Sequence, residues 1–263
     1  MLRAERHDDV TRLELSSWIG RRLGYTVSAY VVGGVLIDTG FPRVASDLAA
    51  WVAARRQDIA GGIVTHWHED HSGGVSALAA LGLPLAIHPE TERRVREAPP
   101  LELYRLLTWG SFPTPHDSLV PFTASGVEVI PMPGHSPEHH VVWARDTGTL
   151  FAGDLFLGVK VRIAHHDEDF RELLASLRKC AAMRPSRMFC GHRGLVPNAA
   201  ATLTAKADWL EETIETIGQR AAQGWSDARI VRDVMGGEEL TGRVSRGHYS
   251  RATFVRAARR AAA

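Results

Sequence analysis

The stretch Thr65-His66-Trp67-His68-Glu69-Asp70-His71-Ser72-Gly73-Gly74 decides what kind of fold and site this chain builds. It follows the short apolar run Gly62-Ile63-Val64, which predicts a strand ending at this point. Side chains placed just past a strand end can converge on one point. Imidazole and carboxylate are the ligands that borderline divalent ions such as Zn²⁺ prefer. The segment offers four such groups within six residues: His66, His68, Asp70 and His71.

Three further ligand-type residues repeat this design downstream, each after an apolar run that ends in glycine. A glycine before the ligand lets the backbone turn sharply and lets a metal ion approach closely. Five of the 13 histidines belong to the combined set, and its order along the chain points to a two-metal hydrolytic site. The three residues are His135 in Met132-Pro133-Gly134-His135, Asp154 in Phe151-Ala-Gly-Asp, and His192 in Met188-Phe-Cys-Gly-His.

Length, composition and charge are those of an ordinary globular protein. The 263 residues are 44% hydrophobic and 23% charged, and 31 basic against 30 acidic side chains give no general attraction to nucleic acid or membrane. No apolar run approaches the roughly 18–20 residues of a membrane span, and the charged start lacks the apolar core of a signal peptide. Cys180 and Cys190 are too few for a disulfide framework and are interpreted as free thiols. We therefore expect a cytoplasmic protein without a membrane partner.

Hydrophobic periodicity predicts alternating strands and helices in the first three quarters of the chain. A hairpin is expected over 25–39 around Gly33-Gly34, then a helix over 43–56, a strand over 61–65 and a helix opened by Ser72. The Pro-punctuated stretch 90–118 is interpreted as a partly helical insertion over the strand ends. The remaining expected elements are strands at 85–88, 127–132, 139–145, 149–153 and 187–190, and a helix at 167–182.

From residue 198 the pattern changes to helices. Apolar residues from Leu203 to Ala221 alternate steps of four and three, which describes a long amphipathic helix over 198–222. Shorter helices are expected at 226–235 and 249–261, around a Gly-rich turn at 236–247. The prediction is a two-layered α/β core over 1–197 and a helical extension over 198–263. The long helix could form a homodimer interface, or it could pack on its own domain.

The ordered motifs resemble those of the metallo-β-lactamase superfamily of hydrolases, and the resemblance covers about residues 10–197. Asp38 in Leu36-Ile-Asp-Thr-Gly matches the family's first motif, ahead of the metal-binding motifs already named. The resemblance implies an α/β (α+β) fold: an αββα four-layer sandwich, with the metals at one edge of the packed sheets and a helical C-terminal extension. It also implies two divalent metal ions, with zinc expected and iron or manganese as alternatives.

The resemblance assigns a role to each ligand. Asp154 would bridge the two ions, and Asp38 would support the site by accepting an imidazole N–H, which fixes ring orientation. Two ions roughly 3.5–4 Å apart can bind and activate a bridging hydroxide as nucleophile. Asp70 sits beside this nucleophile and could orient it or shuttle its proton. One ion would be held by His66, His68 and His135, and the other by Asp70, His71 and His192.

The predicted reaction is hydrolysis of an ester, thioester or lactone of a small molecule. Asp154 stands where the family's periplasmic β-lactamases carry Cys, and His68 stands where its di-iron oxygen-reducing members carry Glu. The alternative is a phosphodiesterase or nuclease acting on RNA or a nucleotide, because 225–263 holds eight Arg against four acidic residues. A non-catalytic scaffold or binding protein is a third hypothesis, which loss of ligands would indicate, and none is lost.

Other polar residues carry weaker predictions. Lys160 and Arg162, in the loop after Asp154, are the best candidates for binding a substrate carboxylate, although a surface role explains them equally well. Six other histidines are interpreted as structural, as parts of a solvated loop or as weak candidates, and Cys190 as a buried strand residue. These histidines are His88, His116, His139, His140, His165 and His166.

Overall fold

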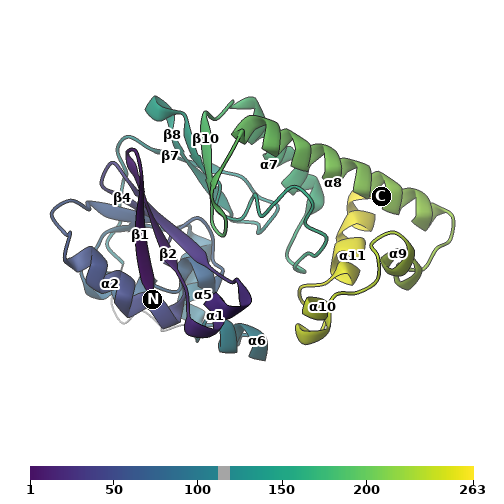
Figure 1. The fold of residues 1–263 in the computed structure, drawn as a ribbon, viewed down its shortest axis with the longest axis horizontal. Coiled ribbons are helices and arrows are strands. Elements are labelled where there is room, and N and C mark those ends of the chain that lie inside the picture. Colours follow the sequence, from purple (N-terminus) through teal and green to yellow (C-terminus); the bar gives the residue numbers. More distant parts are fainter. Residues whose placement is uncertain (112–118) are drawn as a thin grey trace. The chain divides into compact units, whose positions relative to one another are not determined.

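The computed structural model describes residues 1–111 and 119–263 (Figure 1). Contacts divide the chain into two compact units. The first comprises Met1–Pro131, His140–Asp154 and Arg187–Val196, and the second comprises Met132–His139, Leu155–Ser186 and Pro197–Ala263. Part of the predicted insertion, with Pro113-Thr-Pro115 and His116, lies outside the described residues. The predicted domain boundary at 197/198 stays a prediction.

The first unit contains a six-stranded sheet in the order β1-β2-β3-β4-β5-β6. The strands from β1 to β4 are antiparallel neighbours, whereas β4, β5 and β6 run parallel. The β3–β4 hairpin turns at Gly33 and Gly34, whose φ angles of 53° and 78° need glycine's freedom. The bounds are β1 (Leu2–His7), β2 (Val10–Leu15), β3 (Val27–Val32), β4 (Val35–Ile37), β5 (Gly61–Ile63) and β6 (Leu85–Ala86).

A second sheet of five strands, in the order β11-β10-β9-β8-β7, belongs to the same unit. Strands β9 and β10 are parallel, and the other neighbours are antiparallel. The two sheets pack face to face, because Tyr30 of the first sheet lies 5.4 Å from Phe151 and 5.1 Å from Phe189 between ring centroids. The bounds are β7 (Glu128–Pro131), β8 (His140–Ala144), β9 (Thr149–Phe151), β10 (Arg187–Cys190) and β11 (Gly194–Val196).

Helices cover the outer face of the six-stranded sheet. Leu48 of one helix and Val75 of another join Leu13 and Leu36 of the sheet in one buried cluster. This unit therefore has a helix layer and two sheet layers. Its helical segments are α1 (Trp18–Leu23), η1 (Pro42–Val44), α2 (Ala45–Ala53), α3 (Glu69–Ser72), α4 (Val75–Ala80), α5 (Pro89–Glu97), α6 (Leu103–Thr108) and η2 (Arg145–Thr147).

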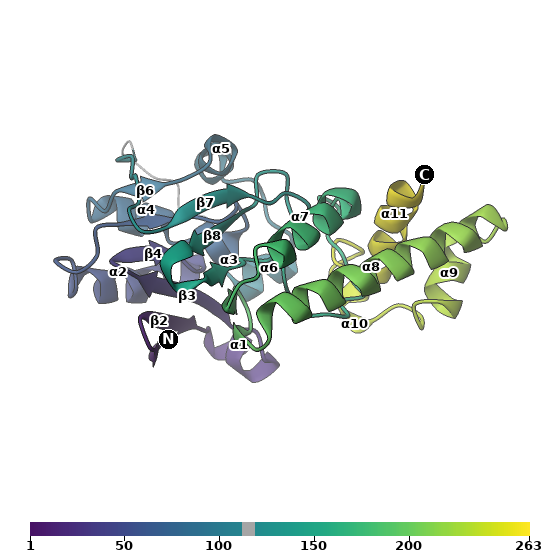
Figure 2. The ribbon, with the colours of Figure 1, turned by 90° about the horizontal axis from the view of Figure 1, so that it is seen from above.

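The second unit is helical. The long α8 (Ala199–Ala222) lies beside α7 (Phe170–Ala182) and beside α11 (Arg251–Ala262), as Figure 2 shows. The apolar face predicted for this helix is buried, and Leu203 and Ile217 on it are fully enclosed. The two remaining helices are α9 (Asp227–Asp233) and α10 (Leu240–Val244). No described helix combines the length and the hydropathy needed to cross a membrane.

Three local predictions are corrected by the structure. Ser72 does not open a helix: it ends α3, its Oγ donates to the carbonyl oxygens of Trp67 and His68, and α4 begins only after Gly74. The predicted Gly-rich turn at 236–247 contains α10. The N-terminal strands β1 and β2 and the short β11 were not anticipated. In the largely exposed β1, with the sequence LRAERH, only Leu2 and Ala4 are apolar.

Candidate metal centre

The His-rich segment places four ligand side chains at the end of β5. His66 and His68 lie in the connection after β5, and Asp70 and His71 lie in α3. His66 and His71 are fully buried, and His68 and Asp70 keep only 2% and 8% of their surface. Polar groups this deeply buried require compensating partners.

His71 is fixed through both its side chain and its backbone. Its Nδ1 lies 2.8 Å from Asp38 Oδ2, so the imidazole contact expected for Asp38 is present. The backbone N–H and the hydroxyl of Thr39 both donate to the His71 carbonyl, at 2.7 and 2.8 Å. Asp38 has a φ of 62°, a left-handed conformation that Asp tolerates better than most residues. The Asp38-Thr39 pair therefore orients His71.

Asp154 presents its two carboxylate oxygens to two different histidines. Oδ1 lies 3.2 Å from His71 Nε2, and Oδ2 lies 3.2 Å from His192 Nε2. His192 Nε2 is also 3.4 Å from Asp70 Oδ2. Two overlapping ligand groups result, one of His66, His71 and Asp154 and one of Asp70, His71 and His192, each with its donor atoms within 4.8 Å of one another.

The other ring nitrogens of these histidines are bound by protein groups. Nδ1 of His192 lies 2.9 Å from the carbonyl oxygen of Thr26, and Nδ1 of His66 lies 3.0 Å from the Thr65 hydroxyl. Because these bonds and the Asp38 contact all involve Nδ1, the Nε2 atoms of His66, His71 and His192 are the ring nitrogens that can bind a metal ion. His66 Nε2 and His68 Nδ1 face each other at 3.1 Å. Such outer hydrogen bonds set the tautomer and the ring direction of metal ligands.

Gly191 is required at this centre for space. A Cβ at this position would lie 2.6 Å from Asp154 Oδ1 and 2.6 Å from His71 Cε1. Its φ is not in the left-handed region, so a sharp turn is not the reason for the glycine. Gly153 and Gly134 do have positive φ angles, of 49° and 126°. A space kept open among convergent donors fits a bound metal ion.

The carboxylates and imidazoles of this centre shift one another's pKa values. Burial alone would lower the pKa of His71, but Asp154, Asp38 and Asp70 outweigh it and raise that pKa well above its usual value. Burial likewise opposes the shift at His192, whose pKa is raised by Asp154 and Asp70. Conversely, burial would raise the pKa of Asp154, yet His192 and His71 hold it well below its ordinary range. A concentration of carboxylates that stabilises imidazolium also favours a divalent cation.

Three predicted site residues belong to the second unit. His135 is buried in the turn that begins with Gly134, and its Nδ1 lies 3.5 Å from Glu168 Oε1. Its assignment to the metal centre stays a proposal that rests on the family resemblance. Lys160 and Arg162 are exposed in the loop after Asp154, and their substrate-binding role is likewise untested.

Several contributing residues were not anticipated. Thr65 donates its backbone N–H and its hydroxyl to Asp38 Oδ1, at 2.8 and 2.9 Å, and so links Asp38 to His66. Glu69 forms a buried ion pair with Arg105 of α6, with Arg105 Nε 2.6 Å from Oε1 and a second bond from the guanidinium to Oε2. The guanidinium of Arg94 lies 4.5 Å from the Trp67 ring centroid. Because these partners come from distant positions, a local motif could not reveal them.

The other histidines differ in their surroundings. His139 is buried with Nδ1 3.2 Å from the Met132 carbonyl oxygen, as a structural residue would be. His165 was interpreted as part of a solvated loop, but it is only 1% exposed because segment 249–250 packs against it. His166 is exposed, and Cys190 is buried in β10 as predicted.

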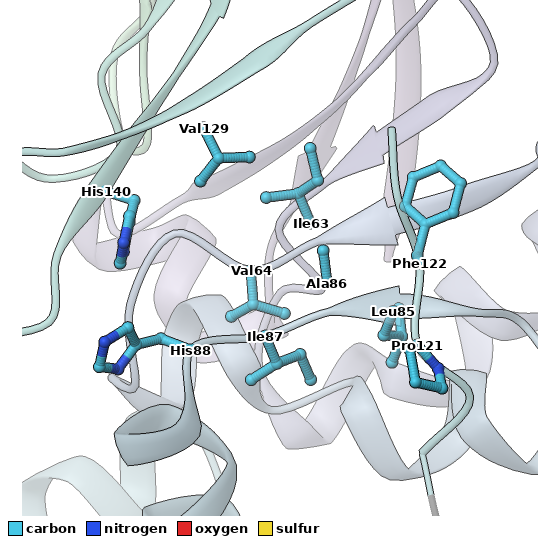
Figure 3. A pocket seen from close by; sticks show the side chains of 10 residues that line it. All are labelled: Ile63, Val64, Leu85, Ala86, Ile87, His88, Pro121, Phe122, Val129 and His140. Atoms are coloured by element: carbon cyan, nitrogen blue, oxygen red, sulfur yellow. The ribbon is translucent and has the colours of Figure 1, made fainter. Parts of the chain in front are cut away.

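A separate pocket of about 350 Å³ lies in the first unit (Figure 3). Its walls are mostly apolar, from β5, β6 and the segment around Pro121 and Phe122. His88 and His140 lie together at one end, with ring centroids 5.2 Å apart, and Phe122 lies at the other. No ligand residue of the metal centre lines this pocket, so the two features are distinct among the described residues.

Known proteins share this sequence and fold. The chain matches the metallo-beta-lactamase superfamily over residues 22–192. It is 32% identical over 207 residues to a beta-lactamase-like protein 2 homolog of Drosophila melanogaster, covering 71% of this chain and 67% of that protein. It is 28% identical over 203 residues to the thioesterase pkgB of Emericella nidulans, covering 72% of this chain but 54% of that protein.

A solved structure agrees with the fold. A metallo-beta-lactamase family protein from Thermus thermophilus superposes with a TM-score of 0.68 at 18% identity, over 95% of this chain and 92% of that one. The chain therefore belongs to the metallo-β-lactamase superfamily. It is a hydrolase with the α/β fold of that family and a C-terminal helical region. Membership implies divalent metal binding, which the donors assembled here fit.

Proposed function

We propose that this protein hydrolyses an ester, thioester or lactone with a dinuclear metal centre. The observation that carries the proposal is the position of Asp154. Its oxygens lie 3.2 Å from His71 and His192, which the family resemblance assigns to one ion, and it also groups with His66, which the resemblance assigns to the other. A carboxylate that serves two sets of ligands at once is suited to bridge two cations. Family resemblance adds His135 to His66 and His68 as the second set.

When bound, two divalent ions would supply an activated water nucleophile and a Lewis acid for the substrate carbonyl. The protein's own residues prepare this chemistry. Each imidazole ring is held by its own partner before substrate arrives: His71 by Asp38, His66 by Thr65, and His192 by the Thr26 carbonyl. Asp70, whose Oδ2 is 3.4 Å from His192 Nε2, is the proposed group that orients the attacking water and takes up its proton.

Acyl chemistry is favoured over phosphodiester chemistry by the relatives and by the C-terminal charges. One of the relatives compared above is named a thioesterase. Of the eight Arg in 225–263, four contact carboxylates, which reduces the basic excess available to phosphate. These are Arg229 and Arg232 with Asp233, Arg251 with Glu239, and Arg259 with Asp227.

The test combines metal analysis of the purified protein with hydrolysis assays on thioesters, lactones and phosphodiesters. We expect thioester or lactone turnover that chelation abolishes and that added Zn²⁺, Fe²⁺ or Mn²⁺ restores. The Asp70→Ala variant should lose turnover by about 10²-fold or more. The exposed Asp146→Ala variant is the matched control and should keep it.

Two results would contradict the proposal. Full activity in Asp70→Ala would remove the assigned role of that carboxylate and the two-metal mechanism with it. Turnover restricted to phosphodiesters, together with salt-sensitive RNA binding, would assign the alternative function instead.

A further inference from the structure

Three histidines of the second unit form a second ligand cluster that the proposed hydrolysis does not use. They are His165 and His166, in the loop between Asp154 and α7, and His248, just before α11. Their donor nitrogens lie within 4.8 Å of one another. His248 is more than 80 residues from His165 and His166 in the chain, so folding and not chain proximity brings it to them.

A short antiparallel bridge brings the two segments together. The backbone N–H of Ala164 donates to the Ser250 carbonyl, and that of Ser250 donates to the Ala164 carbonyl, both at 3.3 Å. Antiparallel register then sets His166 opposite His248, whose ring centroids are 5.7 Å apart. The chain turns at His166, which brings that ring to 4.0 Å from the His165 ring.

The carboxylate of Asp167 contacts two of the three histidines. Asp167 Oδ1 lies 3.1 Å from His166 Nε2, and Oδ2 lies 3.8 Å from His165 Nδ1. Ligand atoms of a tetrahedral zinc site with bonds of about 2.0–2.1 Å are roughly 3.3–3.4 Å apart, so the three donor nitrogens, which lie within 4.8 Å of one another, move closer together when they bind one ion. Buried His165 and half-buried His248 flank the more exposed His166.

We propose that His165, His166 and His248 bind one divalent cation of the Zn²⁺ type. Imidazole is a ligand that zinc prefers, and the Asp167 carboxylate, which contacts His166 and His165, is available as a fourth ligand. The ion fastens the loop that carries Lys160 and Arg162 to the segment preceding α11. Its role is to order that loop, and the inference does not depend on the proposed reaction.

The test is a Zn²⁺ titration of the full chain, with bound metal counted after gel filtration. Wild type should bind one ion more than His248→Ala and one more than His166→Ala. The His66→Ala/His71→Ala variant, which lacks one assigned ligand of each hydrolytic ion, should still bind the ion of the second cluster, and adding His248→Ala should lower the count by one. His88→Ala, which removes an exposed histidine outside the cluster, should keep the wild-type count.

Equal counts in wild type and His248→Ala at saturating Zn²⁺ would overturn the inference. His248→Gln preserves side-chain size and should lose the same ion, so a folding defect of the alanine variant can be recognised. If the hydrolytic centre held only one ion, the difference of one between wild type and His248→Ala would persist. Failure of the dinuclear proposal is thus distinguishable from failure of this one.

Discussion

Asp38 Oδ2 lies 2.8 Å from Nδ1 of His71, and its other oxygen accepts two bonds from Thr65. One carboxylate therefore supports both ends of the His-rich segment, since the Thr65 hydroxyl also contacts His66. We propose that Asp38 supports the metal ligands through these contacts and does not bind metal itself.

The Asp38→Asn variant tests this support. Asn tolerates the left-handed backbone of residue 38 but replaces one acceptor oxygen with an amide donor. We expect Zn²⁺ affinity to fall about 10–100-fold, as measured by competition with a chromophoric chelator. The exposed Asp47→Asn variant should bind Zn²⁺ as wild type does. Equal affinities in both variants would refute the supporting role of Asp38.

Gly191→Ala should disable the centre without unfolding the protein. The added methyl would lie 2.6 Å from Asp154 Oδ1 and 2.6 Å from His71 Cε1, so the bridging carboxylate must move. We expect loss of bound metal and at least a tenfold loss of turnover, with an unchanged far-UV circular dichroism spectrum. Gly224→Ala is the control: its φ of 80° strains an added side chain, but no atom lies within 4 Å of the methyl, so both should be retained. Wild-type metal content in Gly191→Ala would mean that the space is not needed.

Removing one partner of the buried Glu69–Arg105 pair should lower the free energy of unfolding strongly. Arg105→Met leaves the enclosed Glu69 carboxyl without its charged partner, so the free energy of unfolding should fall by about 3–5 kcal/mol in urea denaturation. Glu69→Gln/Arg105→Met should recover much of that loss. The surface pair Arg145–Glu128 is the comparison, and breaking it should cost at most about 1 kcal/mol. Similar losses for the two pairs would contradict the importance of burial.

Cys180 gives a pH dependence that is separate from the metal centre. Burial raises the pKa of this thiol to about 12, whereas an exposed thiol ionises near about 8.5. Above the lower value the unfolded chain releases a proton that the folded chain retains, so stability is fully present below it and falls as pH rises toward 12. Cys180→Ala should show a shallower loss of stability between about pH 9 and about 12. An identical slope in wild type and variant would contradict the burial effect.

The sequence predicted what is local. The ligands from His66 to His71 are contiguous, and Asp38, Asp154 and His192 each follow an apolar strand, so a single pattern identified them. It could not predict how Thr65 links Asp38 to His66, or that α6 supplies Arg105 to Glu69, because those partners are set by tertiary packing.

At two further positions the sequence did not reveal which neighbours the folded chain would bring close. Ser72 resembles a helix N-cap, but its hydroxyl is already bound to the Trp67 carbonyl, and α4 begins later. For Gly191 the sequence suggested both a turn and a close approach of a metal ion; the backbone makes no left-handed turn there, and the glycine leaves space beside Asp154 and His71. In both cases the residue type was informative, but its reason depended on neighbours that only the folded chain brings close.

Anomalous X-ray diffraction from crystals of the Zn²⁺-loaded protein tests the central claim most directly, because it locates each ion and its ligands. The account predicts two ions about 3.5–4 Å apart, with Asp154 coordinating both and His71 and His192 on the same ion. A single ion at this centre, or two ions that do not share Asp154, would contradict the dinuclear mechanism.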